Sequence, residues 1–173
     1  MAARASTRAR PVQEAAPEAE EHLGLPRWLP WAASVLGLAG VGVSSYLTIA
    51  HYDSSVQLAC SASGIVDCAK VTTSAQSKIV GIPVAVLGLA WFLAMTGINL
   101  PPAWRAASPW VARARLALAV SGIGFVLYLI SAELLIIGAI CVWCTSAHVL
   151  AFLLFMLVLS GTGRTGLGQR PQA

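Results

Sequence analysis

Residues 116–160 read LALAVSGIGFVLYLISAELLIIGAICVWCTSAHVLAFLLFMLVLS, a stretch of 45 residues with a single formal charge, Glu133. A helix needs about 20 apolar residues to cross the hydrocarbon core of a bilayer. One helix of this length would be far too long. The stretch therefore predicts two spanning helices, at about 112–134 and 139–160, with a tight hairpin somewhere in 134–140.

Two further apolar segments precede this hairpin. Residues 28–50 carry no charge, and Trp28 and Trp31 stand at their start, as in the aromatic belt of membrane helices. Residues 79–100 are apolar again, with Gly81 and Pro83 in the first turn or two, where proline costs a helix least. The sequence thus predicts an all-α integral membrane protein, a bundle of four transmembrane helices forming one domain over residues 28–160.

Composition supports this class. The chain is 57% hydrophobic and 10% charged, whereas a soluble domain carries about 25% charged residues. The net charge of +4 does not indicate nucleic-acid binding, because the basic residues lie in tails and loops and form no basic face. We interpret residues 1–27 as a disordered tail and residues 161–173 as a flexible tail. The first apolar segment is too long for a cleaved signal peptide and is expected to remain as an anchor.

The distribution of basic residues predicts the orientation. Nine arginines flank one side of the predicted helices, and only Lys70 and Lys78 lie on the other side. Cytoplasmic loops are enriched in Lys and Arg. We therefore expect both termini to be cytoplasmic, in the inner membrane of a bacterium. The nine are Arg4, Arg8, Arg10, Arg27, Arg105, Arg113, Arg115, Arg164 and Arg170.

The four cysteines all fall near the opposite, extracytoplasmic face. Cys60 and Cys68 lie in the first outside loop, and Cys141 and Cys144 in the first turn or two of the last helix. That face is oxidising in a bacterium, where disulfides form and persist. The loop around Cys60 is mostly small and polar, and residues 69–78 are compatible with a short amphipathic helix over the bundle.

The C-x2-C spacing has a chemical meaning. Residues i and i+3 share a helix face, and the helix dipole favours thiolate at the thiol nearest the N-terminus. His148 continues the same stripe. This pattern favours an electron relay in which the loop pair oxidises a soluble thiol protein and the helix pair passes electrons to a lipid-soluble acceptor, for which a quinone is suitable.

Other interpretations of the cysteines stay open at this point. Cysteine packs well as a small buried residue, and four cysteine ligands can hold structural zinc. However, the loop spacing of C-x7-C is outside the short spacing usual for zinc, and we predict no metal site. A transporter is disfavoured because the predicted helices contain no intramembrane charged pair and no break in mid-span.

The ordered set of motifs resembles the bacterial form of the vitamin K epoxide reductase (VKOR) family. It comprises a first outside loop with two cysteines, DCAKVTTSAQSKIVGIPVAVLG at residues 67–88, and CVWC at residues 141–144. The resemblance covers roughly residues 30–160. A DsbB-type protein would have the same role, but its C-x2-C pair belongs in the first outside loop, so the order here is reversed.

The resemblance implies a role for each site residue. Cys60 would exchange with a DsbA-like thioredoxin-fold protein, and Cys68 would pass electrons to Cys141. Cys144 would lie against a quinone ring and form the reduced adduct or charge-transfer pair. Ser74 and His148 would shape the quinone pocket, with His148 near the position of a tyrosine in animal members.

Two departures from the family pattern limit the comparison. The asparagine that animal members carry early in the second helix is not evident in GIPVAVLG, residues 81–88, so vitamin K epoxide is not implied as the substrate. Many bacterial members carry a fused thioredoxin-like domain after the last helix, whereas this sequence ends about a dozen residues beyond it. We therefore expect the partner to be a separate chain, and the quinone to be menaquinone or ubiquinone.

Overall fold

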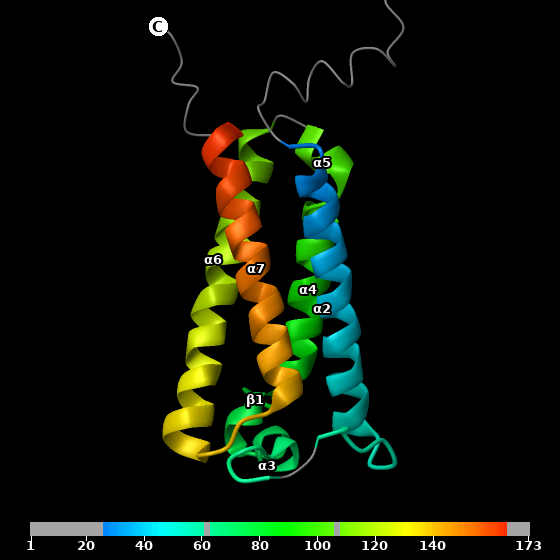
Figure 1. Cartoon of the computed structure of the whole chain (residues 1–173), viewed down its shortest axis with the longest axis vertical. Coiled ribbons are helices and arrows are strands. Elements are labelled where there is room, and N and C mark those ends of the chain that lie inside the picture. Colours follow the sequence, from blue (N-terminus) through cyan, green and yellow to red (C-terminus); the bar gives the residue numbers. More distant parts are fainter. Residues whose placement is uncertain (1–25, 61–62, 106–107, 166–173) are drawn as a thin grey trace, which may run out of the picture.

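A computed structural model describes residues 26–60, 63–105 and 108–165. In this part of the chain, four long helices run side by side along one axis (Figure 1): α2 (Trp28–Tyr52), α4 (Val84–Ile98), α6 (Pro109–Ser131) and α7 (Val142–Thr165). Helix α2 packs against α4 and α7, and α6 packs against α7 and α4. Of the predicted tails, 1–27 and 161–173, residues 1–25 and 166–173 lie outside the described residues, whereas residues 161–165 continue α7 and are not part of a tail.

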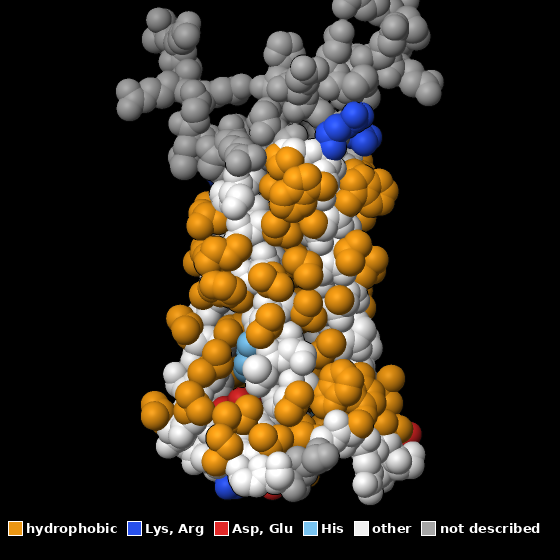
Figure 2. All heavy atoms as spheres, in the orientation of Figure 1, with side chains coloured by type: hydrophobic (Ala, Val, Ile, Leu, Met, Phe, Trp, Pro, Cys, Tyr) orange, Lys and Arg blue, Asp and Glu red, His pale blue; other side chains and the backbone are white. Residues whose placement is uncertain are grey.

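The bundle has the dimensions and surface of a membrane protein. Among the described helices, three segments are long and apolar enough to cross a membrane: Trp28–Tyr52, Pro109–Ile137 and Val142–Thr162. Helix α4 is apolar but has only 15 residues, or about 22 Å at 1.5 Å per residue. Hydrophobic side chains cover the middle of the face shown in Figure 2, and Lys and Arg appear there only near the two ends. The predicted all-α membrane fold is confirmed.

The second apolar segment begins its helix later than the sequence indicates. Strand β1 (Lys78–Ile79) pairs antiparallel with β2 (Ile82–Pro83), and α4 starts only at Val84. The turn between the strands uses Val80 and Gly81, whose φ angles are 50° and 81°. Pro83 directly precedes the helix, where its missing N–H breaks no intrahelical bond.

The last hairpin turns through a π-helix. Helix α6 continues into η2 (Ala132–Ile137), and Gly138, the residue that follows η2, has a φ of 64°. Glycine suits this left-handed conformation because it has no Cβ. After three more residues α7 begins, so α6 and α7 run antiparallel and pack along their length.

Two hydrophobic clusters fill the bundle. The larger one joins all four long helices through Ala33, Phe92, Met95, Ala119, Ala151, Leu154 and Val158. Close approach of α2 and α4 requires Gly40, because a Cβ there would lie 2.1 Å from Cδ1 of Phe92. The smaller cluster lies at the cysteine-bearing end and contains Cys68 and Cys141.

The two ends of the bundle differ in content. One end carries α3 (Cys68–Thr72), η1 (Ala75–Ser77) and the β-hairpin, and the other carries α5 (Pro101–Arg105) and both ends of the described chain (Figure 1). Near α5, the buried Arg115 side chain donates hydrogen bonds to the carbonyls of Ile98 and Ala103, at 2.9 and 3.2 Å from Nη2. It also stacks on Trp104, 3.6 Å from the ring centroid, and so fastens the connection between α4 and α6.

Candidate active site

The loop pair of cysteines forms a disulfide. Cys60 and Cys68 are bonded, with their Cα atoms 6.1 Å apart. Cys68 is buried and starts α3, whose N-cap residue Asp67 accepts a hydrogen bond from the backbone N–H of Lys70 at 2.9 Å. Cys60 is only partly buried. Of the two sulfurs, Cys60 is therefore the more accessible to a soluble protein.

The helix pair consists of two free thiols. Cys141 is not inside the helix, as the sequence suggested, but directly precedes α7 and caps it. Its carbonyl accepts from the backbone N–H of Thr145 at 2.8 Å, and its Sγ accepts from the backbone N–H of Cys144 at 3.2 Å. The sulfur thus takes the place of the side-chain oxygen that usually caps a helix.

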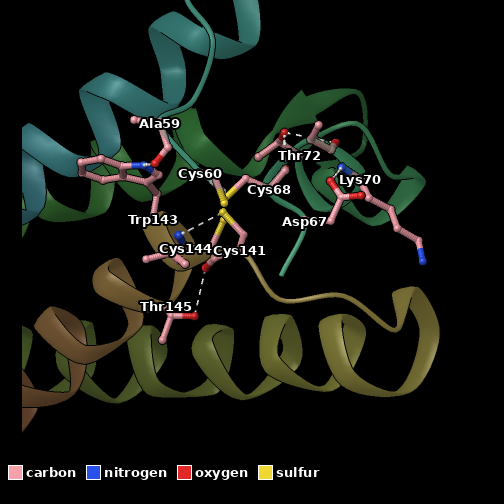
Figure 3. The surroundings of a disulfide bond; sticks show 12 residues. Ala59, Cys60, Asp67, Cys68, Lys70, Thr72, Cys141, Trp143, Cys144 and Thr145 are labelled. Atoms are coloured by element: carbon pink, nitrogen blue, oxygen red, sulfur yellow. Dashed lines mark hydrogen bonds between the residues drawn. A yellow bond between two sulfur atoms is a disulfide. The ribbon is translucent and has the colours of Figure 1, made fainter. Parts of the chain in front are cut away.

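The backbone ties the two pairs together. The N–H of Ile140 donates to the carbonyl of Ile65 at 2.8 Å, and the N–H of Asp67 donates to the carbonyl of Ile140 at 3.1 Å. These bonds form a parallel bridge just before Cys68 and just before Cys141. Both cysteines belong to one buried cluster, against which Cys60 and Cys144 also pack. Figure 3 shows the Cys141 side chain directed toward the disulfide.

Two aromatic residues hold the segment before Cys60. Trp143 Nε1 donates to the carbonyl of Ala59 at 3.1 Å (Figure 3). The Tyr46 hydroxyl donates to the carbonyl of Gln57 at 3.2 Å and accepts from the N–H of Ala59 at 3.0 Å. The two rings meet edge to face at 4.7 Å. The sequence analysis missed both residues, and the one available signal was an aromatic residue between the two cysteines of CVWC.

The environment of Cys141 favours its thiolate. The hydrogen bond from the Cys144 side chain is the largest cause that lowers the pKa of Cys141, and the Cys144 and Trp143 backbone N–H groups add to it. Burial and the nearby Glu133 carboxylate oppose this shift but do not reverse it. A thiol with a lowered pKa carries more of the nucleophilic form at neutral pH.

A cavity of about 370 Å³ lies among the four long helices. Its wall is largely apolar and includes the aromatic side chains of Trp91, Phe92 and Phe125. The predicted pocket residues Ser74 and His148 both line it, as does Cys144, whereas Cys141 does not. The two thiols of CVWC therefore face different neighbours, with Cys141 toward the disulfide and Cys144 toward the cavity.

The cavity suits a small apolar ring with polar oxygens. Ligand sites typically measure about 300–1,000 Å³ and combine an apolar wall with a few polar groups. Here those groups include Ser44, Ser74, Glu133, Cys144 and His148. Within the described ranges, no group of three or more His, Cys, Asp or Glu side chains is placed to hold a metal ion.

A membrane helix bundle that joins a disulfide, a C-x2-C pair and an apolar cavity is the architecture of a membrane thiol oxidoreductase. The model of the Vitamin K epoxide reductase family matches residues 31–159, and the chain belongs to this family. A search of curated proteins gives no match. Membership implies a membrane thiol–quinone oxidoreductase, in a family that generally works with thioredoxin-fold partners.

Proposed function

We propose that this protein reoxidises a separate, DsbA-like thioredoxin-fold protein and passes the electrons to a membrane quinone, menaquinone or ubiquinone. The path runs through Cys60 and Cys68 to Cys141 and Cys144. The proposal rests on the different surroundings of the inner pair, Cys141 and Cys144. Cys141 packs with the disulfide, whereas Cys144 lines the cavity. The product is an oxidised partner that can form disulfides in other proteins.

The first exchange takes place at the outer disulfide. A thiolate of the reduced partner attacks the sulfur of Cys60, the less buried of the two, and Cys68 leaves as a thiolate. The second thiol of the partner then attacks its own mixed disulfide and releases reduced Cys60. The partner leaves oxidised, and the outer pair holds two electrons.

The second exchange moves these electrons inward. The Cys68 thiolate attacks Cys141 of an oxidised Cys141–Cys144 pair, and Cys144 is the leaving thiolate. The lowered pKa of Cys141 also makes Cys141 a better leaving group when Cys60 resolves the Cys68–Cys141 bond. The reduced inner pair then gives two electrons to a quinone whose ring lies against Cys144, with Ser74 and His148 at its oxygens.

We further propose an orientation for the bundle. The cysteine-bearing end would face the extracytoplasmic side of a bacterial inner membrane, and the end with Arg105, Arg113 and Arg115 would face the cytoplasm, as the excess of arginine favours. Besides the three long apolar segments, the shorter helix α4 would also cross the membrane. The β-hairpin would extend it at one end and α5 at the other. A membrane-impermeant maleimide should label a Val80→Cys variant in intact cells, and protection of that cysteine until lysis would reject the orientation.

The function is tested by quinone reduction in detergent. Purified protein is mixed with a reduced DsbA-like partner and either a naphthoquinone or a benzoquinone, and quinone absorbance is followed. Wild type should turn over repeatedly, whereas Cys144→Ala should reduce no quinone and Cys60→Ala should no longer accept electrons from the partner. Folded wild-type protein that reduces neither quinone would overturn the proposal.

A further inference from the structure

Glu133 carries a buried carboxyl group that has no role in the thiol exchanges proposed above. Its side chain lines the cavity together with Cys144 and His148, and the residue is only 6% exposed. Among the described residues it is the only Asp or Glu within a helix. A carboxyl group at this depth is costly unless it serves a function or has a partner.

The local backbone brings Glu133 next to the thiols. Glu133 lies in η2, the π-helix that ends the hairpin, and its carbonyl accepts from the N–H of Ala139 at 3.2 Å. This compact turn places the carboxyl group within hydrogen-bonding reach of the Cys141 backbone N–H. Its charge acts on both Cys141 and Cys144. π-Helical segments are rare and often mark functional sites.

No Lys or Arg side chain of the described cavity lining faces Glu133. The titratable groups that share this cavity are His51 on α2 and Cys144 and His148 on α7, and its described lining contains no Lys or Arg. Helix α3, which packs against η2, carries Lys70, but that side chain is exposed and does not line the cavity. Glu133 is thus free to exchange a proton with the thiols and with a molecule in the cavity.

The chemistry of the inner pair needs such a group. When Cys141 and Cys144 form a disulfide, one S–S bond forms, two S–H bonds break, and two electrons and two protons leave. A quinone takes both electrons and both protons and becomes a quinol. Cys144 lines the cavity and can hand its proton directly to the nearer quinone oxygen. Cys141 does not line the cavity, so its proton needs a carrier.

We propose that Glu133 carries the Cys141 proton to the quinone, an assignment that rests on the proposed function. When Cys144 is joined to the quinone ring, the Cys141 sulfur attacks Cys144, the bond between Cys144 and the ring breaks, and its electron pair stays on the quinone. The Glu133 carboxylate takes the Cys141 proton during this attack, and the resulting carboxylic acid gives the proton to a quinone oxygen. Glu133 ends the cycle as it began, and the only oxidant consumed is the quinone. The reductant of the quinone is the dithiol of Cys141 and Cys144, which the outer pair has reduced beforehand.

The test compares Glu133→Gln, which keeps size and polarity but cannot carry a proton, with Glu133→Asp, which can. Reduced protein is mixed rapidly with quinone over a range of pH, and the outer exchange with the reduced partner is measured separately. In Glu133→Gln, quinone reduction should slow by about 100-fold and lose the part of its pH dependence that comes from the Glu133 carboxyl group, while the outer exchange stays within about twofold of wild type. Glu133→Asp should regain part of the rate and the pH profile.

A second readout follows a single turnover. Time-resolved infrared spectra, taken after the dithiol form is mixed with one equivalent of quinone, should contain a transient carboxyl C=O band in wild type that is absent in Glu133→Gln. Equal rates and pH profiles in wild type and Glu133→Gln would overturn the inference and leave the proposed function intact. Loss of folding in both variants would assign Glu133 a structural role and also overturn it. Wild type without quinone reduction would refute the proposed function, and the inference with it.

Discussion

Cys141 both ends a connecting segment and caps a helix. Cys141 is the last residue of the segment between η2 and α7, which is joined to the loop before Cys68 by the bridge between Ile140 and Val66. Its sulfur also caps α7, because it accepts a hydrogen bond from the backbone N–H of Cys144. A sulfur at a helix N-terminus receives the partial positive charge of unpaired N–H groups. The same hydrogen bond therefore fixes both the sulfur that we propose as the nucleophile and the start of the helix.

The Cys144 side chain should control the thiolate of Cys141. Its hydrogen bond is the largest cause that lowers the pKa of Cys141, so that the thiolate persists to lower pH than in an ordinary cysteine. Cys144→Ala removes the donor, whereas Cys144→Ser keeps an O–H. In both variants Cys141 can attack the outer disulfide and release Cys60, which maleimide labelling detects.

We expect the half-maximal rate of this attack to occur at lower pH in Cys144→Ser than in Cys144→Ala. The sign follows because a lowered pKa keeps the nucleophilic form as pH falls. Identical pH profiles in the two variants would show that the Cys144 side chain does not set the pKa of Cys141.

At this scale the sequence predicts a good part of the site. The i, i+3 spacing and the position near a helix start already indicate an activated thiol, and Ser74 and His148 do line the cavity that contains Cys144. The capping role of Cys141 could not be predicted, because it depends on where the helix begins to within one residue. The sequence assigns no role to Glu133, because a lone charge near a predicted hairpin gives no sign of facing a cavity.

At the scale of elements, the segment before Cys60 is held from two helices. Tyr46 comes from α2 and Trp143 from the start of α7, and both bond to the backbone of Ala59. This contact joins an outer-loop segment to helices that are nearly 100 residues apart in sequence. It keeps the partly exposed Cys60 at a defined place above the inner pair.

Tyr46→Phe should loosen this segment without disturbing the cavity. The substitution keeps the ring contact with Trp143 but removes a hydroxyl that makes two backbone hydrogen bonds. Loss of these hydrogen bonds should destabilise the bound position of the segment before Cys60 by about 1 kcal/mol. This free energy corresponds to about a fivefold decrease in the population of that position. Exchange between the partner and Cys60 should slow by about this factor, whereas prereduced protein should reduce quinone at the wild-type rate. An unchanged rate of partner exchange would show that Tyr46 does not position Cys60.

The elements differ in how far the sequence specifies them. Long apolar segments predict helices α2, α6 and α7 because burial in lipid requires backbone groups to be satisfied within the segment. The segment 79–100 misleads, since its apolar residues Ile79 and Ile82 belong to a two-stranded hairpin before the helix. The bridge between Val66 and Ile140 is not visible in a linear pattern, because it pairs single residues far apart in the chain.

At the scale of the whole molecule, helix contacts depend on small residues. Lipid offers apolar surroundings to every helix, so association depends on close packing. The contact between Gly40 and the Phe92 ring shows how tightly α2 and α4 approach. These helices supply much of the cavity wall, and their distance apart therefore sets its shape.

Two alanine substitutions on α2 test this dependence. A Cβ at Gly40 would overlap the Phe92 ring, whereas a Cβ at Gly42 meets nothing within 4 Å. Gly40→Ala should destabilise the fold by about 1–3 kcal/mol and lower the melting temperature in detergent. Gly42→Ala serves as the matched control and should be neutral or slightly stabilising, since alanine favours helix. Equal melting temperatures would mean that α2 and α4 can separate without cost.

The cavity has a practical consequence for any assay in detergent. A chamber of about 370 Å³ with a mainly carbon wall accepts an alkyl chain as well as a ring, and each buried methylene contributes about 0.8 kcal/mol. We therefore expect solubilising amphiphiles to compete with quinone for this cavity. The apparent KM for quinone should rise with amphiphile chain length and concentration, and should fall when the protein is moved into a lipid nanodisc.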